Sequence, residues 1–120
     1  MTPPADGRPI FIEIADHIAD DVLAGIYPEE AQVPSTTELS LHYRVNPATA
    51  GKALTRLVDE GVLYKRRGLG MFVTTGAPEA LRARRRAAFA DHYLRPVLAE
   101  GNRLGLSPAD IIDLIRKESS

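Results

Sequence analysis

The sequence predicts a mainly α-helical chain with one small β-hairpin, an α+β fold. Three observations support this prediction. Two helix starts with capping residues follow each other closely, near Thr36 and at Asn46. A short run rich in apolar residues follows them and turns at Gly68-Leu69-Gly70. Apolar residues also recur at helical spacing on both sides of this stretch.

The first helix is expected to begin at Ile10. Its apolar face carries Phe11, Ile14, Ala15, Ile18 and Val22, and Glu13, Asp16 and Asp20 lie opposite. It should end near Gly25, after which a loop returns the chain to Val33 and pairs beside the hairpin. Residues 1–8 are rich in Pro and Gly, so we expect a flexible arm there.

The second helix begins near Thr36, because Ser35 and Glu38 have the spacing of a capping box. Leu39 and Tyr43 lie one turn apart on its inner side, and the helix should end around Arg44. The third helix follows after only a few residues. This short connection is typical of a helix-turn-helix.

The third helix is predicted to start at Asn46, which is an N-cap residue, with Pro47 at the tolerated first helical position. Val45 and Ala50 have the spacing of a hydrophobic staple, which fixes the entry angle of the helix. The expected buried stripe consists of Ala50, Ala53, Leu54, Leu57 and Val58. Thr49, Lys52 and Arg56 lie on the opposite side, where they can meet a phosphate or a base.

The hairpin is predicted after Gly61, with strands over residues 62–67 and 71–74. Lys65, Arg66 and Arg67 crowd its tip, and the glycines allow a tight turn and close approach to a partner. A basic hairpin behind a helix-turn-helix is the order of a winged helix-turn-helix. This order suits binding at the edge of a DNA groove.

Residues 33–73 resemble the DNA-binding domain of GntR-family bacterial transcription regulators. The family pattern reads roughly L-P-S-x-R-x-L-A, a short turn, T-x-R-x-A-L-x-x-L-x-x-x-G, and a wing R-x-G-x-G-x-F-V. The matching positions here are Val33, Pro34, Ser35, Leu39, Thr49, Ala53, Leu54, Leu57, Gly61, Arg66, Gly68, Gly70, Phe72 and Val73. The opening Asn46-Pro47-Ala48-Thr49 and the tail of some forty residues are most similar to the short YtrA-type branch, whose members resemble dimeric repressors.

The sequence departs from the family pattern where arginines are usual, with Thr37, Pro47 and Gly51 in their place. Base recognition by those positions therefore does not carry over, and phosphate contacts look better supplied than bidentate guanine contacts. The candidate DNA-binding residues are Ser35, Thr36, Thr37, Arg44, Asn46, Pro47, Ala48, Thr49, Lys52, Arg56, Lys65, Arg66, Arg67, Gly68 and Gly70.

The charge is unevenly spread along the 120 residues, although the formal net charge is only -1. Residues 44–86 hold ten basic and three acidic side chains, whereas the first thirty hold seven acidic ones and Arg8. Local asymmetry of this kind is what DNA binding requires. The chain has no cysteine and no apolar run long enough to span a membrane, so we expect a cytoplasmic protein without membrane contact.

Two helices are predicted beyond the hairpin. The first covers residues 79–100 and should be kinked or ended early by Pro96. After a turn over residues 101–105, Ser107 and Pro108 cap the second. Two such helices cannot enclose a core, so they pack on the preceding domain, on a second copy, or on both. The candidate dimerisation residues are Leu81, Phe89, Tyr93, Val97, Ile111, Ile112, Leu114 and Ile115.

The expected organisation is a flexible arm (1–8), a winged helix-turn-helix DNA-binding domain (9–76) and a helical dimerisation tail (77–120). The expected function is that of a dimeric, sequence-specific repressor on double-stranded DNA. A two-fold dimer predicts an inverted-repeat operator with half-sites about 34 Å apart, or a multiple of that. A winged-helix module that binds proteins without DNA specificity is the alternative. Neither a cofactor nor enzymatic activity is expected, because no nucleophile with a base, paired carboxylates or phosphate-binding loop is visible.

Three further groups of residues have both a functional and a structural interpretation. The residues from Arg82 to Arg86 could touch phosphate or pair with acidic residues of a partner helix. His17, His42 and His92 are far apart in sequence, so no metal site is expected. Phe89 and Tyr93 favour a dimer seam over a small effector pocket, and the existence of an effector stays undecided.

Overall fold

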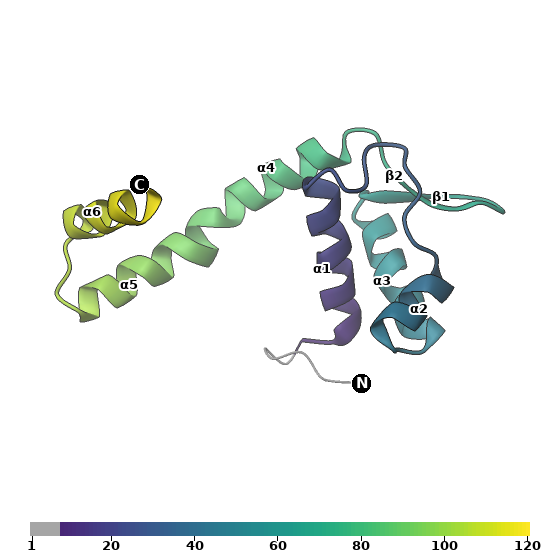
Figure 1. The fold of residues 1–120 in the computed structure, drawn as a ribbon, viewed down its shortest axis with the longest axis horizontal. Coiled ribbons are helices and arrows are strands. Elements are labelled where there is room, and N and C mark those ends of the chain that lie inside the picture. Colours follow the sequence, from purple (N-terminus) through teal and green to yellow (C-terminus); the bar gives the residue numbers. More distant parts are fainter. Residues whose placement is uncertain (1–7) are drawn as a thin grey trace. The chain divides into compact units, whose positions relative to one another are not determined.

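The computed structural model describes residues 8–120 and contains a helical chain with one hairpin (Figure 1). The expected flexible arm, apart from Arg8, lies outside the described residues. The elements in chain order are α1 (Ile10–Leu23), α2 (Thr36–Tyr43), α3 (Pro47–Asp59), β1 (Leu63–Arg66), β2 (Gly70–Val73), α4 (Ala77–Phe89), the π-helical turn η1 (Ala90–Leu94), α5 (Arg95–Arg103) and α6 (Pro108–Ser119).

The described chain forms two compact units, which meet within α4 between Arg82 and Ala83. We expected the first domain to end at residue 76. The first unit extends further because Ala77 and Leu81 of α4 are buried in its core, with 3% and 7% of their surface exposed. The start of α4 therefore does not coincide with the edge of the compact unit.

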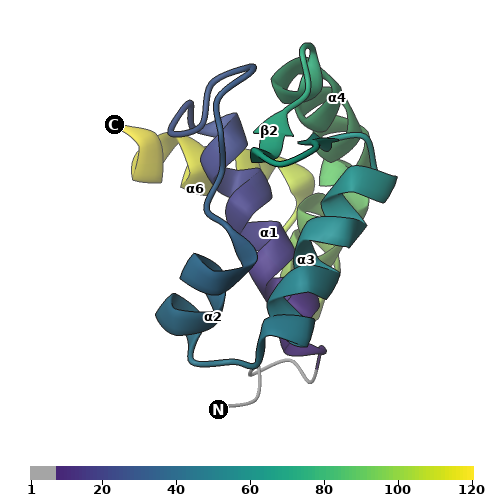
Figure 2. The ribbon, with the colours of Figure 1, turned by 90° about the vertical axis from the view of Figure 1, so that its right-hand side faces the viewer.

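Helices α1, α2 and α3 form the body of the first unit, with α1 and α2 both packed against α3 (Figure 2). Helix α1 ends as expected before Gly25, which has a positive φ of 80°. Its apolar face supplies Ile14, Ile18 and Val22 to the core. The residues buried in this core are Ile14, Ala15, Ile18, Ala19, Val22, Val33, Leu39, Val45, Ala50, Ala53, Leu54, Leu57, Val62, Leu63, Val73, Ala77 and Leu81.

The hairpin is antiparallel, with Leu63 opposite Val73 and Arg66 opposite Gly70. The first strand is shorter than predicted, and the second begins and ends one residue earlier than predicted. The loop before α2 pairs beside β2, as expected, through a bridge between Gln32 and Phe72. Backbone hydrogen bonds on either side of this bridge join Val33 to Met71 and Ala31 to Val73. This third segment matters because an isolated two-stranded hairpin is only marginally stable in water.

The second unit contains the end of α4, η1, α5 and α6. The expected disturbance by Pro96 takes the form of η1, in which the Arg95 N–H donates to the Ala90 carbonyl. Proline offers no N–H and its ring collides with the carbonyl four residues earlier, so the preceding turn widens instead of continuing as a regular α-helix. Helix α6 starts with the predicted cap, since Ser107 and Asp110 form a capping box.

The turn between α5 and α6 lies later than predicted. Helix α5 runs to Arg103, so Gly101 is helical, and the positive φ of 75° occurs at Gly105. Gly101 is buried where α5 meets α6, and a Cβ built on it would lie 2.6 Å from Ile111 Cδ1. Gly101 therefore serves close helix packing and not a turn.

Candidate nucleic-acid interface

The connection between α2 and α3 is a tight turn with three local features that stabilise it. Arg44 takes a left-handed conformation with φ of 56°, and the Ser40 hydroxyl donates to the Val45 carbonyl at 2.6 Å. Val45 and Ala50 are both buried, as the predicted hydrophobic staple requires. The geometry of a helix-turn-helix is thus fixed by the residues of the turn itself.

Both helices of this motif start with a side-chain cap. Ser35 Oγ accepts from the Glu38 N–H at 3.1 Å, and the Glu38 carboxylate accepts from the Ser35 N–H at 3.0 Å. The hydrogen bonds from the Ser35 backbone and hydroxyl hold the pKa of Glu38 below its ordinary value. At the start of α3, Asn46 Oδ1 accepts from the Thr49 N–H at 2.9 Å. Ser35 and Asn46 therefore already have a structural role.

The remaining residues predicted around the two helix starts are accessible. Arg44, Pro47 and Ala48 are exposed, as is Thr37 on α2. Thr36 and Thr49 are partly buried. The N-terminal end of α3 thus presents a surface of small, mostly uncharged groups, beside the exposed guanidinium of Arg44. Small side chains permit close approach of a helix end to a large partner.

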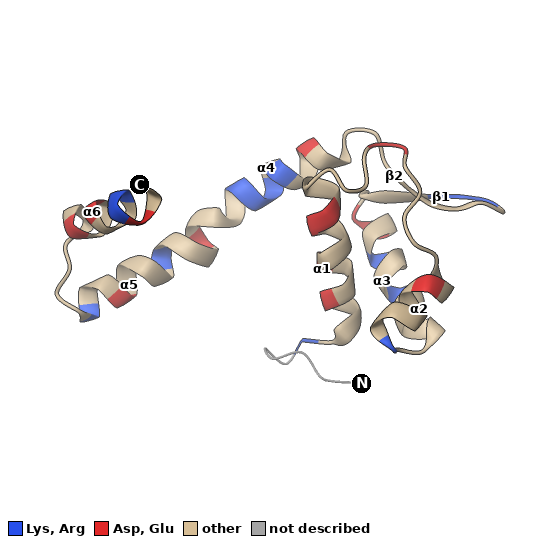
Figure 3. Ribbon diagram, viewed as in Figure 1, with Lys and Arg blue, Asp and Glu red and all other residues tan. Residues whose placement is uncertain are grey.

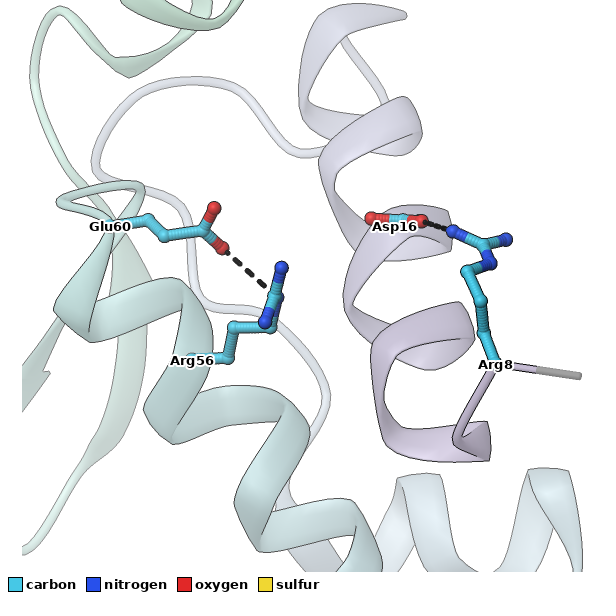
Figure 4. Close-up of polar contacts among 4 residues, drawn as sticks. All are labelled: Arg8, Asp16, Arg56 and Glu60. Atoms are coloured by element: carbon cyan, nitrogen blue, oxygen red, sulfur yellow. Dashed lines mark hydrogen bonds and ion pairs between the residues drawn. The ribbon is translucent and has the colours of Figure 1, made fainter.

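Further along α3, the structure restricts one predicted contact residue. Arg56 forms an ion pair with Glu60 at 3.5 Å, shown in Figure 4 together with the pair between Arg8 and Asp16. Lys52 lies over the Phe11 ring of α1, with Nζ 5.1 Å from the ring centroid. Both basic residues line a shallow groove of about 500 Å³ with Phe11, Thr55, Asp59 and Glu60.

Arg56 is exposed on this flank of α3, as expected, and its contact with DNA stays a prediction. Two carboxylates share the groove with Lys52 and Arg56, so this flank of α3 has mixed charge. The i, i+4 spacing of Arg56 and Glu60 places their side chains on adjacent turns of the same flank. Exposed ion pairs of this kind contribute little free energy. Glu60 therefore holds the Arg56 side chain only weakly, and Arg56 stays accessible to solvent.

The tip of the hairpin is basic and accessible. Lys65, Arg66 and Arg67 are all exposed. The Arg66 guanidinium lies over the Phe72 ring at 4.7 Å, which orients this side chain along the hairpin. Gly68 and Gly70 have positive φ values of 76° and 129°, so both glycines are required by the backbone of the turn.

The base of the hairpin is tied to the preceding loop by a carboxylate. Glu30 accepts hydrogen bonds from the Tyr64 hydroxyl and, at 2.5 Å, from the Thr75 hydroxyl. These bonds, from Thr75 first and then Tyr64, lower the pKa of Glu30, and the same contact raises the pKa of Tyr64. Phe72 is 9% exposed and Tyr64 is partly buried, so neither offers an open ring for stacking on a base.

Charge is distributed unevenly over the first unit, as predicted. Figure 3 shows basic positions along α3 and at the end of the hairpin, and acidic positions on α1. On α4, Arg82 pairs with Glu79 at 3.1 Å. Arg84, Arg85 and Arg86 are exposed. Contact with phosphate and pairing with acidic residues of a partner helix are both compatible with this exposure.

In the second unit, most of the predicted dimerisation residues have large exposed apolar surfaces. Phe89 and Tyr93 form a ring pair with centroids 5.4 Å apart, and they are 51% and 65% exposed. A groove of about 760 Å³ between α5 and α6 is lined by seven apolar side chains and rimmed by Glu100 and Glu118. Those side chains are Pro96, Val97, Leu104, Leu106, Ile111, Leu114 and Ile115.

Two predicted dimerisation residues are placed differently. Leu81 is buried in the core of the first unit, so it belongs to that core and not to an exposed seam. Ile111 is 8% exposed because it packs against Gly101 within the second unit. The sequence pattern placed them in one set with Phe89 and Ile115 because an apolar stripe does not reveal which partner covers each residue.

Four residues important to these surfaces were not identified from the sequence. Gln32 and Leu69 meet at the hairpin tip, where Gln32 Nε2 donates to the Leu69 carbonyl at 2.6 Å. Leu98 and Leu104 add exposed apolar surface to the second unit. Leu104 follows Val97 by seven residues and Leu98 follows Leu94 by four, which is helical spacing, whereas nothing in the sequence pattern pointed to Gln32.

The described residues contain no group of acidic, histidine or cysteine side chains able to hold a metal ion. His17 Nδ1 lies 3.1 Å from the Tyr43 hydroxyl, and His42 packs edge-on against the same ring. His17 thus joins α1 to α2, whereas His42 packs against its neighbour within α2. Among the helices of residues 8–120, none is long and apolar enough to cross a membrane.

Two proteins of Bacillus subtilis are similar to this chain. The uncharacterized HTH-type transcriptional regulator YurK is 38% identical over 65 residues, covering 54% of this chain and 27% of YurK. The HTH-type transcriptional repressor YtrA is 31% identical over 78 residues, covering 65% of this chain and 60% of YtrA. The match thus spans about a quarter of the length of YurK and of several other curated relatives.

Two solved structures extend the comparison. A transcriptional regulator from Oenococcus oeni is 25% identical, with a TM-score of 0.79 over 100% of this chain and 96% of that one. AraR(DBD) in complex with operator ORR3 is 26% identical, with a TM-score of 0.54 over 62% of this chain and 92% of that one. Residues 12–73 match the family model described as bacterial regulatory proteins, gntR family. This chain therefore belongs to the gntR family of bacterial regulatory proteins.

Proposed function

We propose that the chain is a sequence-specific DNA-binding regulator of transcription. The observation that supports this most directly is the tight α2–α3 turn with the accessible N-terminal end of α3, followed by an exposed basic hairpin. In such a motif the second helix enters the major groove and the hairpin, hereafter the wing, lies beside it. The similarity to AraR(DBD), which was solved with an operator, supports the same assignment.

The proposed contacts divide by chemistry. Lys65, Arg66, Arg67 and Arg44 carry accessible charges that suit phosphates. Thr49 and Lys52 on α3 are the candidates for reading base edges, with Pro47 and Ala48 allowing close approach. Ser35, Thr36, Thr37, Asn46, Gly68 and Gly70 complete the proposed surface. Arg56 contributes less than the sequence suggested, since Glu60 competes for its guanidinium.

We also propose that the protein works as a dimer and represses transcription by occupying an operator. The exposed apolar side chains of residues 83–120 supply the surface for a second copy, which agrees with a division into a DNA-binding part and a dimerisation tail. A two-fold dimer requires an inverted repeat in the DNA. Repression is inferred from relatives such as YtrA, and a cytoplasmic location follows from the proposed DNA target.

The test is a selection of duplexes from a random pool with the full chain. Fluorescence anisotropy then compares the selected duplex with a scrambled duplex at several salt concentrations. We expect the selected duplex to bind at least about a thousandfold more tightly at physiological salt, with a steep salt dependence and an inverted-repeat consensus. Equal, weak binding to both duplexes would contradict the proposal and favour a protein partner.

Two variants separate the proposed phosphate and base contacts. Arg67→Ala should weaken binding to both duplexes alike and reduce the salt slope by about one, because it removes one cation. Thr49→Val should change the preference among duplexes and leave the salt slope intact. If Thr49→Val weakened both duplexes equally, Thr49 would not read bases.

A further inference from the structure

The wing receives different support at its base and at its tip. At the base, the loop over residues 30–33 adds a third backbone ladder to β2, with the Glu30 N–H donating to Val73 at 2.8 Å and the Val33 N–H donating to Met71 at 3.0 Å. The chain then leaves the sheet, because Ser35 caps α2. The ladder formed by these backbone bonds therefore stops before the residues that form the turn.

A single side chain extends this support to the tip. Gln32 lies opposite Phe72, so its side chain can reach diagonally towards Gly70, which precedes Phe72 by two residues on β2. Its Nε2 donates to the Leu69 carbonyl at 2.6 Å. A Cβ on Gly70 would lie 2.7 Å from this nitrogen, so the absence of a side chain at Gly70 leaves the space that the amide occupies.

The turn is thereby closed from both sides. Within the hairpin, the Leu69 N–H donates to the Arg66 carbonyl at 2.9 Å, which forms the turn. From outside, Gln32 binds the carbonyl of the same residue. Both polar backbone groups of Leu69 are thus fixed, and its orientation relative to the wing is determined.

The side chain held in this way is apolar and points away from the core. Leu69 is 63% exposed at the end of a basic hairpin, two residues after Arg67. Neither the apolar core of the first unit nor the polar network around Glu30 includes it. Proteins that bind the DNA minor groove frequently combine basic residues with an apolar side chain placed against the bases.

We propose that Gln32 is a positioning residue for DNA binding, and that it holds the wing tip so that Leu69 makes an apolar contact in the minor groove. This inference rests on the proposed function. A tip that is already ordered loses less conformational entropy on binding than a free one. One hydrogen bond of this kind stabilises the ordered tip enough to change affinity by about fivefold.

The test compares Gln32→Met with the wild type on the selected and scrambled duplexes. Methionine has the length of glutamine and no charge, but it cannot donate to Leu69. We expect about fivefold weaker binding to the selected duplex, an unchanged salt slope and a thermal midpoint lowered by only a few degrees, since one hydrogen bond is lost from the folded state. Thr75→Val is the matched control, because it removes a side-chain hydrogen bond from the same loop at the far end of the hairpin. It should leave affinity within about twofold.

A double substitution tests whether Gln32 acts through Leu69. Leu69→Ala alone should weaken binding to the selected duplex, and adding Gln32→Met should then cost much less than fivefold. Additive losses would mean that Gln32 contacts DNA by itself and would overturn the positioning role. If the wild type prefers the selected duplex and Gln32→Met binds that duplex equally tightly, the inference is overturned and the proposed function still stands. A wild type without preference would instead reject the proposed function.

The minor-groove placement has its own readout. Replacing adenine by 2,6-diaminopurine adds an amino group to the minor groove and leaves the major-groove edge unchanged. We expect this duplex to weaken the wild type more than Leu69→Ala, because only the wild type brings the leucine side chain against that edge. Equal weakening of both proteins would place Leu69 outside the minor groove.

Discussion

The first unit covers its own apolar residues, whereas the second does not. In the first, Ile14, Leu54, Leu57 and Leu63 are at most 2% exposed, since three helices and a hairpin surround them. In the second, only α5 and α6 face each other, and Ile111 is its one large apolar side chain in the buried core set of residues 8–120. The exposed set contains Phe89, Tyr93, Leu94, Val97, Leu98, Leu104, Ile112, Leu114 and Ile115.

The first unit therefore presents a polar and charged surface that suits a charged polymer, whereas the second presents an apolar surface that suits an apolar partner. Contiguous exposed apolar side chains mark interaction sites in monomeric domains. The first unit can be stable alone, with function carried by polar groups on its surface. The second unit depends on something that covers it, and we propose a second copy.

The largest expected effect comes from the same substitution made in both units. Leu54→Ala should lower the free energy of unfolding by about 3 kcal/mol, because it removes a buried side chain and leaves a cavity. Leu114→Ala, at a site that is 47% exposed, should cost the dilute protein less than about 1 kcal/mol. Urea unfolding at nanomolar protein measures both. Equal losses would show that the second unit has a closed core of its own.

The next effect concerns association. Ile115→Asp places a charge in the exposed apolar groove and should raise the dimer dissociation constant by at least about thirtyfold. Sedimentation equilibrium measures the change, with Leu41→Asp as the control, because Leu41 is 76% exposed on α2 of the first unit. A dimer that persisted in Ile115→Asp and dissociated in Leu41→Asp would move the interface to the first unit.

The smallest effect is a pH dependence shared by two matched capping boxes. The Ser35 and Ser107 backbones donate to Glu38 and Asp110, which lowers the pKa of each carboxylate below its ordinary value of 4.5 and 3.8. Their stabilisation is therefore present above those values and is lost as the pH falls through the lowered pKa. Urea midpoints between pH 7 and pH 3 should show a weaker dependence in Glu38→Gln and in Asp110→Asn.

The two capping-box variants, Glu38→Gln and Asp110→Asn, can also be compared at different protein concentrations. If the second unit is stabilised by a second copy, the effect of Asp110→Asn should change with protein concentration. The effect of Glu38→Gln should not, since the first unit covers its own core. Identical concentration dependence of both variants would remove the distinction between the two units.

The sequence was sufficient for features that depend on neighbouring residues. Ser35 with Glu38, Asn46 with Pro47, and Ser107 with Asp110 mark helix starts through bonds that span only three residues. The wing glycines and the apolar stripe of α3 are equally local. The same reasoning predicted the loop beside β2 and the disturbance at Pro96.

Features that depend on distant residues were not predictable in this way. The hydrogen bond from Gln32 to Leu69 joins positions 37 residues apart, and a lone glutamine carries no periodic signal. Leu81 could not be distinguished from the exposed apolar residues, because its burial depends on where α4 crosses the first unit. Arg56 was assigned correctly to a solvent-facing flank, but its ion pair with Glu60 reduces its availability.

Gly101 shows how a position can be restricted without taking part in recognition. A glycine inside a helix lowers helix stability by about 1 kcal/mol relative to alanine, so local propensity disfavours it. The 2.6 Å separation between a built Cβ and Ile111 Cδ1 means that the Ile111 side chain would have to shift to admit an alanine. Ile111 also lines the apolar groove between α5 and α6. A substitution at position 101 would therefore change the floor of the surface proposed for a second copy, although none of the exposed residues of that surface had been replaced.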